Sequence, residues 1–329
     1  MKTNKKTLGM FAVIFVILLF VPLIFRSNYY MTIICQILIY SIVVFGMNFI
    51  TGMTGQMNLA SAGIMACGGY TMAILGTKFG LSPWIGLVAA IAVGYLIGQL
   101  LGYPSLKLKG TYLALTTLAF TEVVRLLATN MVELTGGTQG IKNIPCFSIF
   151  GFKFDSSFKF YYLALAFFIV AMLASLRIVK SKWGREFLAV RDNIEAIDSL
   201  GLDVKRIKLR AFTLAAIFTA VAGVLYVSFY QYMNSATYTT GLSFNFVIML
   251  LLGGIGSVYG NVIGAILVIL LPELLRFLGD FYQMFFYLLA LLCAMFFPKG
   301  VISIVEKIRN VVLSDRKKAV AAGGKSGKE

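Results

Sequence analysis

Long apolar runs separated by short polar stretches dominate the chain. The runs fall near residues 8–25, 29–50, 56–76, 82–103, 111–131, 160–179, 210–232, 242–255, 257–277 and 281–298. A helix needs about 20 mostly apolar residues to cross the hydrocarbon core of a bilayer. The pattern therefore predicts an all-α polytopic membrane protein with about ten transmembrane helices.

The composition agrees with a membrane environment. Of the 329 residues, 59% are hydrophobic and 13% are charged, whereas soluble domains average about 25% charged residues. The net charge of +16 would suggest nucleic acid in a soluble protein. Here we interpret it through the positive-inside rule, by which Lys and Arg gather in cytoplasmic loops.

The positions of the basic residues predict an orientation. With the N-terminus in the cytoplasm, most of the 29 Lys and Arg residues fall on the cytoplasmic side. An even number of spans then places both termini in the cytoplasm of a plasma or inner membrane. We interpret residues 8–25 as a retained span. We expect residues 1–309 to form one transmembrane domain and the small, polar stretch 310–329 to be a disordered cytoplasmic tail.

Polar residues and glycines interrupt the third apolar run, in the stretch "GMTGQMNLASAGIMACGGY". Polar groups without partners cost several kcal/mol in lipid, so these side chains must face other helices or a wet path. A thin, polar, uncharged helix suits the passage of a small solute, and hydrogen-bonded helix packing is the alternative. The candidates for lining a translocation pathway are Gly55, Gln56, Asn58, Ser61, Gly63 and Tyr70.

Two ladders of glycines repeat every four residues, and each therefore lies on one helix face. Glycine at such positions lets two helix backbones approach closely in lipid. The ladders predict helix packing, either within this chain or against a partner subunit. They fall in the fourth and ninth runs, which suggests an internal repeat of about five spans. The glycines are Gly94, Gly98 and Gly102, and Gly256, Gly260 and Gly264.

Two charged residues lie inside the fifth run. Glu122 and Arg125 are three residues apart, so they share a helix face and can form an ion pair. Intramembrane charges usually face the interior of a bundle and often mark function. The pair is either structural or a contact for a substrate or gate.

The largest hydrophilic insert spans residues 177–210. Phe187, Val190, Ile194 and Ile197 recur in it at helical spacing, which predicts an amphipathic helix that stops near Gly201. A helix lying on lipid is disfavoured, because its three acids would oppose anionic headgroups. We expect a short helix that inserts into a groove of a cytoplasmic partner.

The sequence offers little for catalysis. It contains no histidine, and its four cysteines lie far apart, so neither a metal site nor another cofactor is predicted. A membrane enzyme is disfavoured for the same reason. An ion-driven secondary transporter would need intramembrane acids or histidines, and only Glu122 lies well inside a span.

Several stretches together resemble a known family. They include "GMTGQMNLASAGIMACGGY", "LKLKGTYLALTTLAFTEVVR", "LTGGTQGI", "WGREFLAVRDNIEAIDSLGLDVKRIKLRAFTLAAIFTAVAGVLY", "LLGGIGSVYGNVIGA" and "FFPKGV". In order and spacing these are similar to the permease subunits of branched-chain amino acid ABC importers, of the leucine/isoleucine/valine type. The resemblance covers roughly residues 30–305.

The resemblance implies an ABC importer permease fold and several partners. These are a second homologous permease subunit, two cytoplasmic ATPase subunits that hydrolyse the ATP, and an extracytoplasmic substrate-binding protein. The family's relatives also imply alternatives, namely urea, short amides, another amino acid, or a sugar or nucleoside. The matching loop implies that an ATPase is met by Arg185, Arg191, Asp192, Glu195, Ala196 and Gly201.

Overall fold

A computed structural model describes residues 22, 27–108, 110–149, 151–199, 201–296 and 300–301. The span predicted at 8–25, apart from residue 22, and the tail predicted at 310–329 lie outside the described residues. The helices are α2 (Asn28–Met47), η1 (Asn48–Thr54), α3 (Ser61–Lys78), α4 (Pro83–Ser105), α5 (Thr111–Asn130), α6 (Val132–Thr135), η2 (Gly137–Gln139), α7 (Ser157–Lys180), α8 (Lys182–Asp192), α9 (Ile194–Ser199), α10 (Val204–Tyr230), η3 (Ser235–Thr237), α11 (Thr240–Gly253), α12 (Val258–Leu274), η4 (Leu275–Phe281) and α13 (Tyr282–Phe296).

Four short strands lie in the loops at one end of the bundle. β1 (Ile141–Lys142) pairs antiparallel with β4 (Tyr232–Met233), with Ile141 opposite Met233. β2 (Ser148–Ile149) pairs antiparallel with β3 (Phe152–Lys153), with Ser148 opposite Lys153. The first pair joins the loop after α5 to the loop after α10, so two loops distant in sequence close the same end of the molecule.

Six helical segments within the described residues are long and apolar enough to cross a membrane, and α11 is a shorter apolar helix. The chain is therefore a multi-pass helical membrane protein. The larger count of about ten spans and the internal repeat remain predictions. The six segments are Asn28–Thr54, Pro83–Ser105, Thr111–Asn130, Ser157–Lys180, Val204–Tyr230 and Val258–Phe277.

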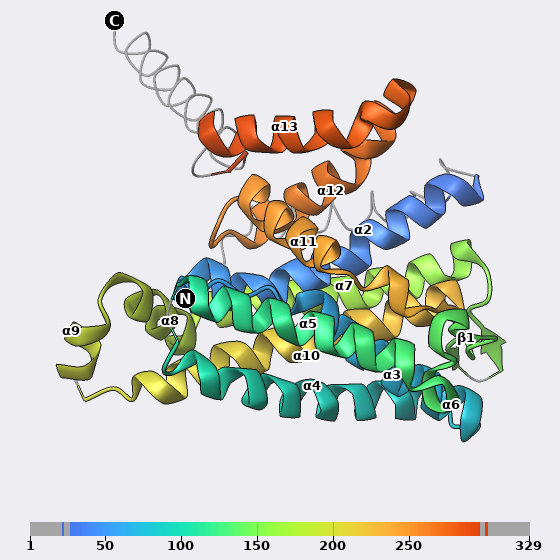
Figure 1. Cartoon of the computed structure of the whole chain (residues 1–329), viewed down its shortest axis with the longest axis horizontal. Coiled ribbons are helices and arrows are strands. Elements are labelled where there is room, and N and C mark those ends of the chain that lie inside the picture. The colour runs from blue at the N-terminus through green and yellow to red at the C-terminus, as the bar shows by residue number, and fades with distance from the viewer. Residues whose placement is uncertain are drawn as a thin grey trace, which may run out of the picture.

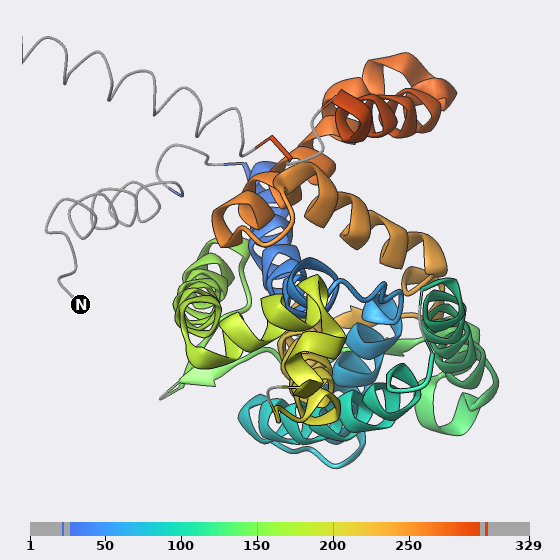
Figure 2. The same cartoon turned by 90° about the vertical axis from the view of Figure 1, so that its left-hand side faces the viewer.

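The helices form a bundle with two distinct ends. In Figure 1, α8 and α9 project at one end, and β1 and α6 lie at the opposite end. Helix α10 packs on α4, α3 and α2, and Figure 2 shows it surrounded by other helices. Of the residues in its most apolar stretch, 67% are buried. The segment Asn28–Thr54, which comprises α2 and η1, is 78% buried, so the core of the molecule lies along α10 and α2.

The first glycine ladder lies where α4 crosses α10. A Cβ atom on Gly98 would lie 2.6 Å from Thr213 Cα, and one on Gly94 would lie 2.9 Å from Ala220 Cβ. On Gly102 a Cβ atom would meet Leu209 Cδ2 at 2.7 Å. All three glycines thus face α10 of the same chain, and their missing side chains allow the close approach.

The second ladder lies between α11 and α12. A Cβ atom on Gly264 would lie 1.8 Å from the Met249 carbonyl oxygen, and one on Gly260 would lie 2.4 Å from that of Gly253. Gly256 precedes α12 in a left-handed conformation, with φ of 83°, and faces open space. Here too the contacts of Gly260 and Gly264 are made within the chain.

Candidate functional site

A helix break lies at the start of the polar stretch singled out from the sequence. After α2 the chain widens into the π-helical turn η1, which ends at Gly55 in a left-handed conformation with φ of 70°. Residues 55–60 are irregular, and α3 starts at Ser61. Irregular backbone at membrane depth is tolerated only inside protein or along a wet cavity. The break therefore needs polar partners from other helices.

Two threonines of α5 supply partners for Leu59. The Thr117 hydroxyl oxygen accepts from the Leu59 amide at 3.0 Å, and the Thr121 hydroxyl donates to the Leu59 carbonyl at 2.9 Å. Both threonines are fully buried. One residue of the break thus has both of its backbone groups satisfied by side chains that lie more than 55 positions further along the chain.

Two more hydrogen bonds hold the start of α3. Asn58 Oδ1 accepts from the Ala60 amide at 2.9 Å, and the Ser243 hydroxyl of α11 accepts from the Ala62 amide at 3.1 Å. The first amides of a helix lack intrahelical partners, so Ser243 satisfies one amide of the first turn of α3, whereas Asn58 bonds to Ala60, the residue just before the helix. Sequence reasoning missed Thr117, Thr121 and Ser243. In the sequence, the only feature that could have marked these residues was a hydroxyl side chain inside an apolar run.

The structure brings together most of the predicted pathway residues but not all of them. Gly55 is exposed and Gln56 is half-buried, with its side-chain amide donating to the Ser105 carbonyl at 3.4 Å. Asn58 and Ser61 are buried. Gly63 packs on α5, where an added Cβ atom would lie 2.9 Å from Thr121 Cα. These five residues cluster around the break.

Tyr70 lies further along α3, where its hydroxyl interacts electrostatically with Tyr232 and Tyr238. It is 6% exposed, and its hydroxyl has no hydrogen-bond partner within the described part of the chain. Tyr226 stacks on Tyr40 with ring centroids 6.0 Å apart and meets Tyr238 at 6.1 Å. Tyr238 is 1% exposed, and within the described residues its hydroxyl also lacks a partner. Tyr70 thus belongs to a separate level of the bundle.

The two charges inside α5 form the ion pair that their spacing allows. Arg125 Nε donates to both oxygens of Glu122, at 3.0 and 3.1 Å. The two side chains are 31% and 37% exposed, for Arg125 and Glu122 respectively. The pair is therefore half-buried, and it lies next to Thr121, the residue of α5 that bonds to the break.

The hydrophilic insert folds into two helices rather than the single helix predicted from its apolar spacing. Helix α8 ends at Asp192, and Asn193 is extended, with φ of −157° and ψ of 107°. Asn193 Oδ1 then accepts from the Glu195 amide at 3.0 Å and caps α9. The interruption arises because this local cap competes with helix continuation.

The apolar face of α8 and α9 points into the chain itself. Phe187 is 0%, Val190 2% and Ile197 3% exposed, whereas Ile194 is 37% exposed. The Phe187 ring lies 6.5 Å from that of Phe49 in η1. The apolar face is therefore used for packing within the chain, so insertion into a partner's groove, which stays a prediction, would have to use the outward-facing side of these helices.

Charged contacts fix α8 against α10 as well. Glu186 is 8% exposed, and its carboxylate lies 3.8 Å from Lys182 and 3.5 Å from Arg210. The Arg210 guanidinium lies over the Trp183 ring at 5.7 Å. Arg191 Nη1 donates to the Gly52 carbonyl at 2.8 Å. Helix α8 is thus held to the bundle by both apolar and polar contacts.

The remaining residues that the resemblance placed at an ATPase point outward or lie at the loop's end. Arg185, Asp192 and Glu195 are exposed. Gly201 is exposed too, with φ of 73° and nothing within 4 Å of an added Cβ atom. Ala196 lies in α9. The structure therefore presents a polar surface from α8 and α9 at this end of the bundle.

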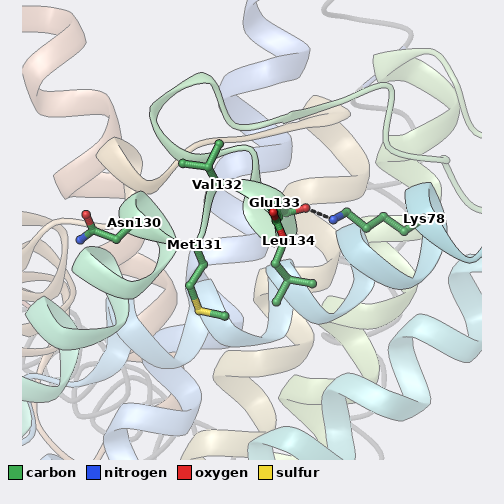
Figure 3. A pocket seen from close by; sticks show the side chains of 6 residues that line it. All are labelled: Lys78, Asn130, Met131, Val132, Glu133 and Leu134. Atoms are coloured by element: carbon green, nitrogen blue, oxygen red, sulfur yellow. Dashed lines mark hydrogen bonds between the residues drawn. The ribbon is translucent and has the colours of Figure 1, made fainter.

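A shallow pocket of about 690 Å³ lies at the opposite end. Figure 3 shows Lys78 reaching from the end of α3 to the Glu133 carbonyl, to which its ammonium group donates. Nearby, the Tyr232 hydroxyl donates to the Gln139 carbonyl at 3.2 Å, which adds to the pairing of β1 with β4. The pocket is lined by Lys78, Asn130, Met131, Val132, Glu133 and Leu134.

A multi-pass bundle with an interrupted, polar helix is typical of membrane transport proteins. Residues 29–295 match the family model described as the permease component of branched-chain amino acid transport systems. The chain therefore belongs to this permease family.

Curated relatives point the same way. The chain is 33% identical over 299 residues to LivM, a high-affinity branched-chain amino acid transport system permease protein of Escherichia coli, covering 83% of this chain and 70% of the relative. It is 32% identical to LivM of Salmonella typhimurium, covering 80% and 68%. It is also 29% identical to the autoinducer 2 import system permease protein LsrC of Salmonella typhi, covering 66% and 58%. No solved structure matches the chain.

Proposed function

We propose that the chain is a permease subunit of an ATP-driven importer and forms part of the translocation pathway for leucine, isoleucine and valine. Family membership supports the transport role. The observation that carries the proposal is the anchored pair α8 and α9, which packs Phe187, Val190 and Ile197 inward. Its outer surface carries exposed charged residues together with the partly exposed Trp183, Leu188 and Ile194. Such a surface suits contact with a cytoplasmic ATPase subunit that moves α8 and α9 when it binds and hydrolyses ATP.

The proposed ATPase contact consists of the outward-facing part of α8 and α9 and the turn that follows. Phe187 and Glu186 hold α8 to the bundle, so a push on the exposed side moves helices and not a loose loop. Arg191 contacts the bundle and is considered separately below. The contact residues are Arg185, Asp192, Glu195, Ala196 and Gly201.

The proposed pathway passes the helix break. A branched-chain amino acid is a zwitterion with an aliphatic side chain, so it needs hydrogen-bonding groups but no net-charged cage. Gln56 and Asn58 offer amides, Ser61 offers a hydroxyl, and the irregular backbone offers further polar groups. Uncharged groups can pass such a solute without trapping it. Glu122 and Arg125 neutralise each other and add no net charge.

The proposed assembly contains a second homologous permease subunit, two cytoplasmic ATPase subunits and an extracytoplasmic substrate-binding protein. In a plasma or inner membrane, α8 and α9 face the cytoplasm together with both termini. The strand-bearing end in Figure 1 then faces the binding protein. About ten crossings follow from the apolar runs and the positive-inside rule.

Reconstitution of the assembly in lipid vesicles tests this function. We expect leucine uptake into the vesicles and leucine-stimulated ATP hydrolysis, both only when the binding protein is present. ATP hydrolysis that is indifferent to the binding protein would contradict the proposal. Leucine uptake driven by an ion gradient through the purified chain alone would instead support a secondary transporter.

The match to LsrC, which is named as an autoinducer 2 import permease, supports one alternative, the import of a small solute other than a branched-chain amino acid. The same vesicles distinguish the two cargoes by competition. Excess unlabelled isoleucine should abolish uptake of labelled leucine, whereas excess ribose and excess urea should not. Uptake of ribose or urea that isoleucine leaves unchanged would favour the alternative.

A further inference from the structure

The π-helical turn η1 lies between the α8 helix and the helix break. Arg191 and Phe187 of α8 contact it from one side. The break at residues 55–60 follows directly. π-Helical turns are rare, and they occur frequently at functional sites. Figure 1 shows that α8 lies at the end of the bundle.

Arg191 supplies a hydrogen bond that the helix itself cannot make. Gly52 lies in the last turn of η1, where carbonyl groups have no partner further along the helix. Arg191 Nη1 donates to the Gly52 carbonyl at 2.8 Å. A cation at a helix C-terminus is also favoured by the helix dipole. The contact is therefore a charge-assisted bond between α8 and η1.

Gly55 makes room for the Arg191 side chain. A Cβ atom on Gly55 would lie 3.1 Å from Arg191 Cγ, and the φ of 70° disfavours any other residue. The stem of Arg191 thus lies against the first residue of the break, while its guanidinium group holds Gly52. One side chain contacts both the π-helical turn and the break.

A second bond joins the turn to the loop between α11 and α12. Asn48 is fully buried, and its Oδ1 accepts from the Gly256 amide at 2.9 Å. A Cβ atom on Gly52 would lie 2.1 Å from Asn48 Oδ1, so only glycine at position 52 leaves space for this bond. The turn is therefore held from α8 on one side and from the α11–α12 loop on the other.

We propose that Arg191 is a positioning residue that transmits movement of α8, through the Gly52 carbonyl, to the helix break and to the α11–α12 loop. The inference rests on the proposed function. It changes the role that the family resemblance implied for Arg191. The residue acts within the chain, whereas Arg185, Asp192 and Glu195 present the surface to the ATPase.

The test uses the complete assembly in vesicles with Arg191→Met, Arg191→Lys and Arg206→Met. Arg206 is the matched control, because it is an exposed arginine on the same side that pairs only with Asp203 among the described residues. Two quantities are measured, the leucine imported per ATP hydrolysed and the hydrogen exchange of amides 48–60 with and without trapped nucleotide. The first quantity is a ratio that does not depend on the amount of assembly, and the second compares the same preparation with and without nucleotide.

We expect Arg191→Met to hydrolyse ATP but to import several-fold less leucine per ATP. The nucleotide-dependent change in exchange at residues 48–60 should be lost in this variant. Arg191→Lys should recover part of both, because lysine can still donate to the Gly52 carbonyl, and Arg206→Met should match the wild type.

Two different results would overturn the inference and are distinguishable. If leucine stimulates ATP hydrolysis by the wild-type assembly and Arg191→Met matches the wild type in both measurements, the positioning role of Arg191 is refuted and the proposed function stands. If ATP hydrolysis by the wild-type assembly does not depend on the binding protein, the proposed function is refuted, and so is the role of Arg191 that rests on it.

Discussion

Thr121 on α5 donates its hydroxyl to the carbonyl of Leu59, 62 residues earlier in the chain, at 2.9 Å. Thr117, one turn before it, accepts from the Leu59 amide at 3.0 Å. The irregular backbone between η1 and α3 is therefore satisfied by an intact neighbouring helix. This arrangement lets a helix break persist inside an apolar bundle.

Replacing either threonine should destabilise the break. Thr117→Val or Thr121→Val keeps the shape of the side chain but leaves a buried backbone group without its partner, which costs about 1–3 kcal/mol. We expect a lower midpoint of thermal unfolding in detergent. Thr116→Val is the control, because among the described residues Thr116 bonds only to the Tyr112 carbonyl of its own helix. Equal midpoints for Thr116→Val and Thr121→Val would contradict the role of Thr121.

Adding a large side chain to the α4 glycine ladder should separate α4 from α10. Gly98→Leu places atoms where Thr213 Cα already lies, 2.6 Å from the Cβ position. Overpacking of this kind costs about 1–3 kcal/mol. The exposed residue Ala92 on the same helix provides the control, and Ala92→Leu should be neutral. The measurement is the yield of monodisperse protein in detergent, which should fall for Gly98→Leu only. An equal fall for both variants would contradict close packing of α10 on the ladder face.

Glu186 should anchor α8 more strongly than its surface neighbours do. Its carboxylate is almost buried, and it lies near Arg210 and Lys182, which remain more exposed. Because Glu186 is nearly buried while its partners are partly exposed, we expect Glu186→Gln to lower the free energy of unfolding by about 1–2 kcal/mol. We expect faster proteolysis within α8 and α9. Lys182→Met, which breaks a 3.8 Å surface pair, should leave the rate almost unchanged. A rate for Glu186→Gln no faster than that for Lys182→Met would exclude this anchoring role.

Reversal of charge on the proposed ATPase surface should impair transport without affecting substrate capture. Glu195 is exposed in α9, so Glu195→Lys changes the surface while the fold is kept. We expect lower leucine uptake and lower stimulated ATP hydrolysis in vesicles, with unchanged binding of leucine by the binding protein. Normal uptake by this variant would argue that α9 does not meet the ATPase.

Two neighbouring residues of the break, Gln56 and Met57, should respond differently to substitution by leucine. Gln56→Leu removes a half-buried amide that bonds to the Ser105 carbonyl, whereas the neighbouring Met57 is 58% exposed and already apolar. We expect Gln56→Leu to raise the KM for leucine uptake or lower its maximal rate, and Met57→Leu to do neither. If the two variants transport alike, Gln56 only packs and does not line the pathway.

Local patterns in the sequence determined the helical, membrane-embedded character of the protein. Apolar runs of about 20 residues predicted the helices, because the hydrocarbon core of a bilayer has a fixed thickness and favours apolar side chains across it. Spacing alone placed Glu122 and Arg125 on one face, and the structure has them paired. The glycine ladders likewise marked close-packed faces at every position except Gly256, which precedes α12 and faces open space.

Only the tertiary structure decided what those faces meet. The rotation and neighbours of each helix depend on contacts between segments distant in sequence, which periodicity does not contain. The pairing of Thr121 with Leu59 and of Arg191 with Gly52 could not be read from either segment alone. The apolar face of α8 turned inward because Phe187 finds Phe49 within the same chain, and burial there removes apolar surface from water.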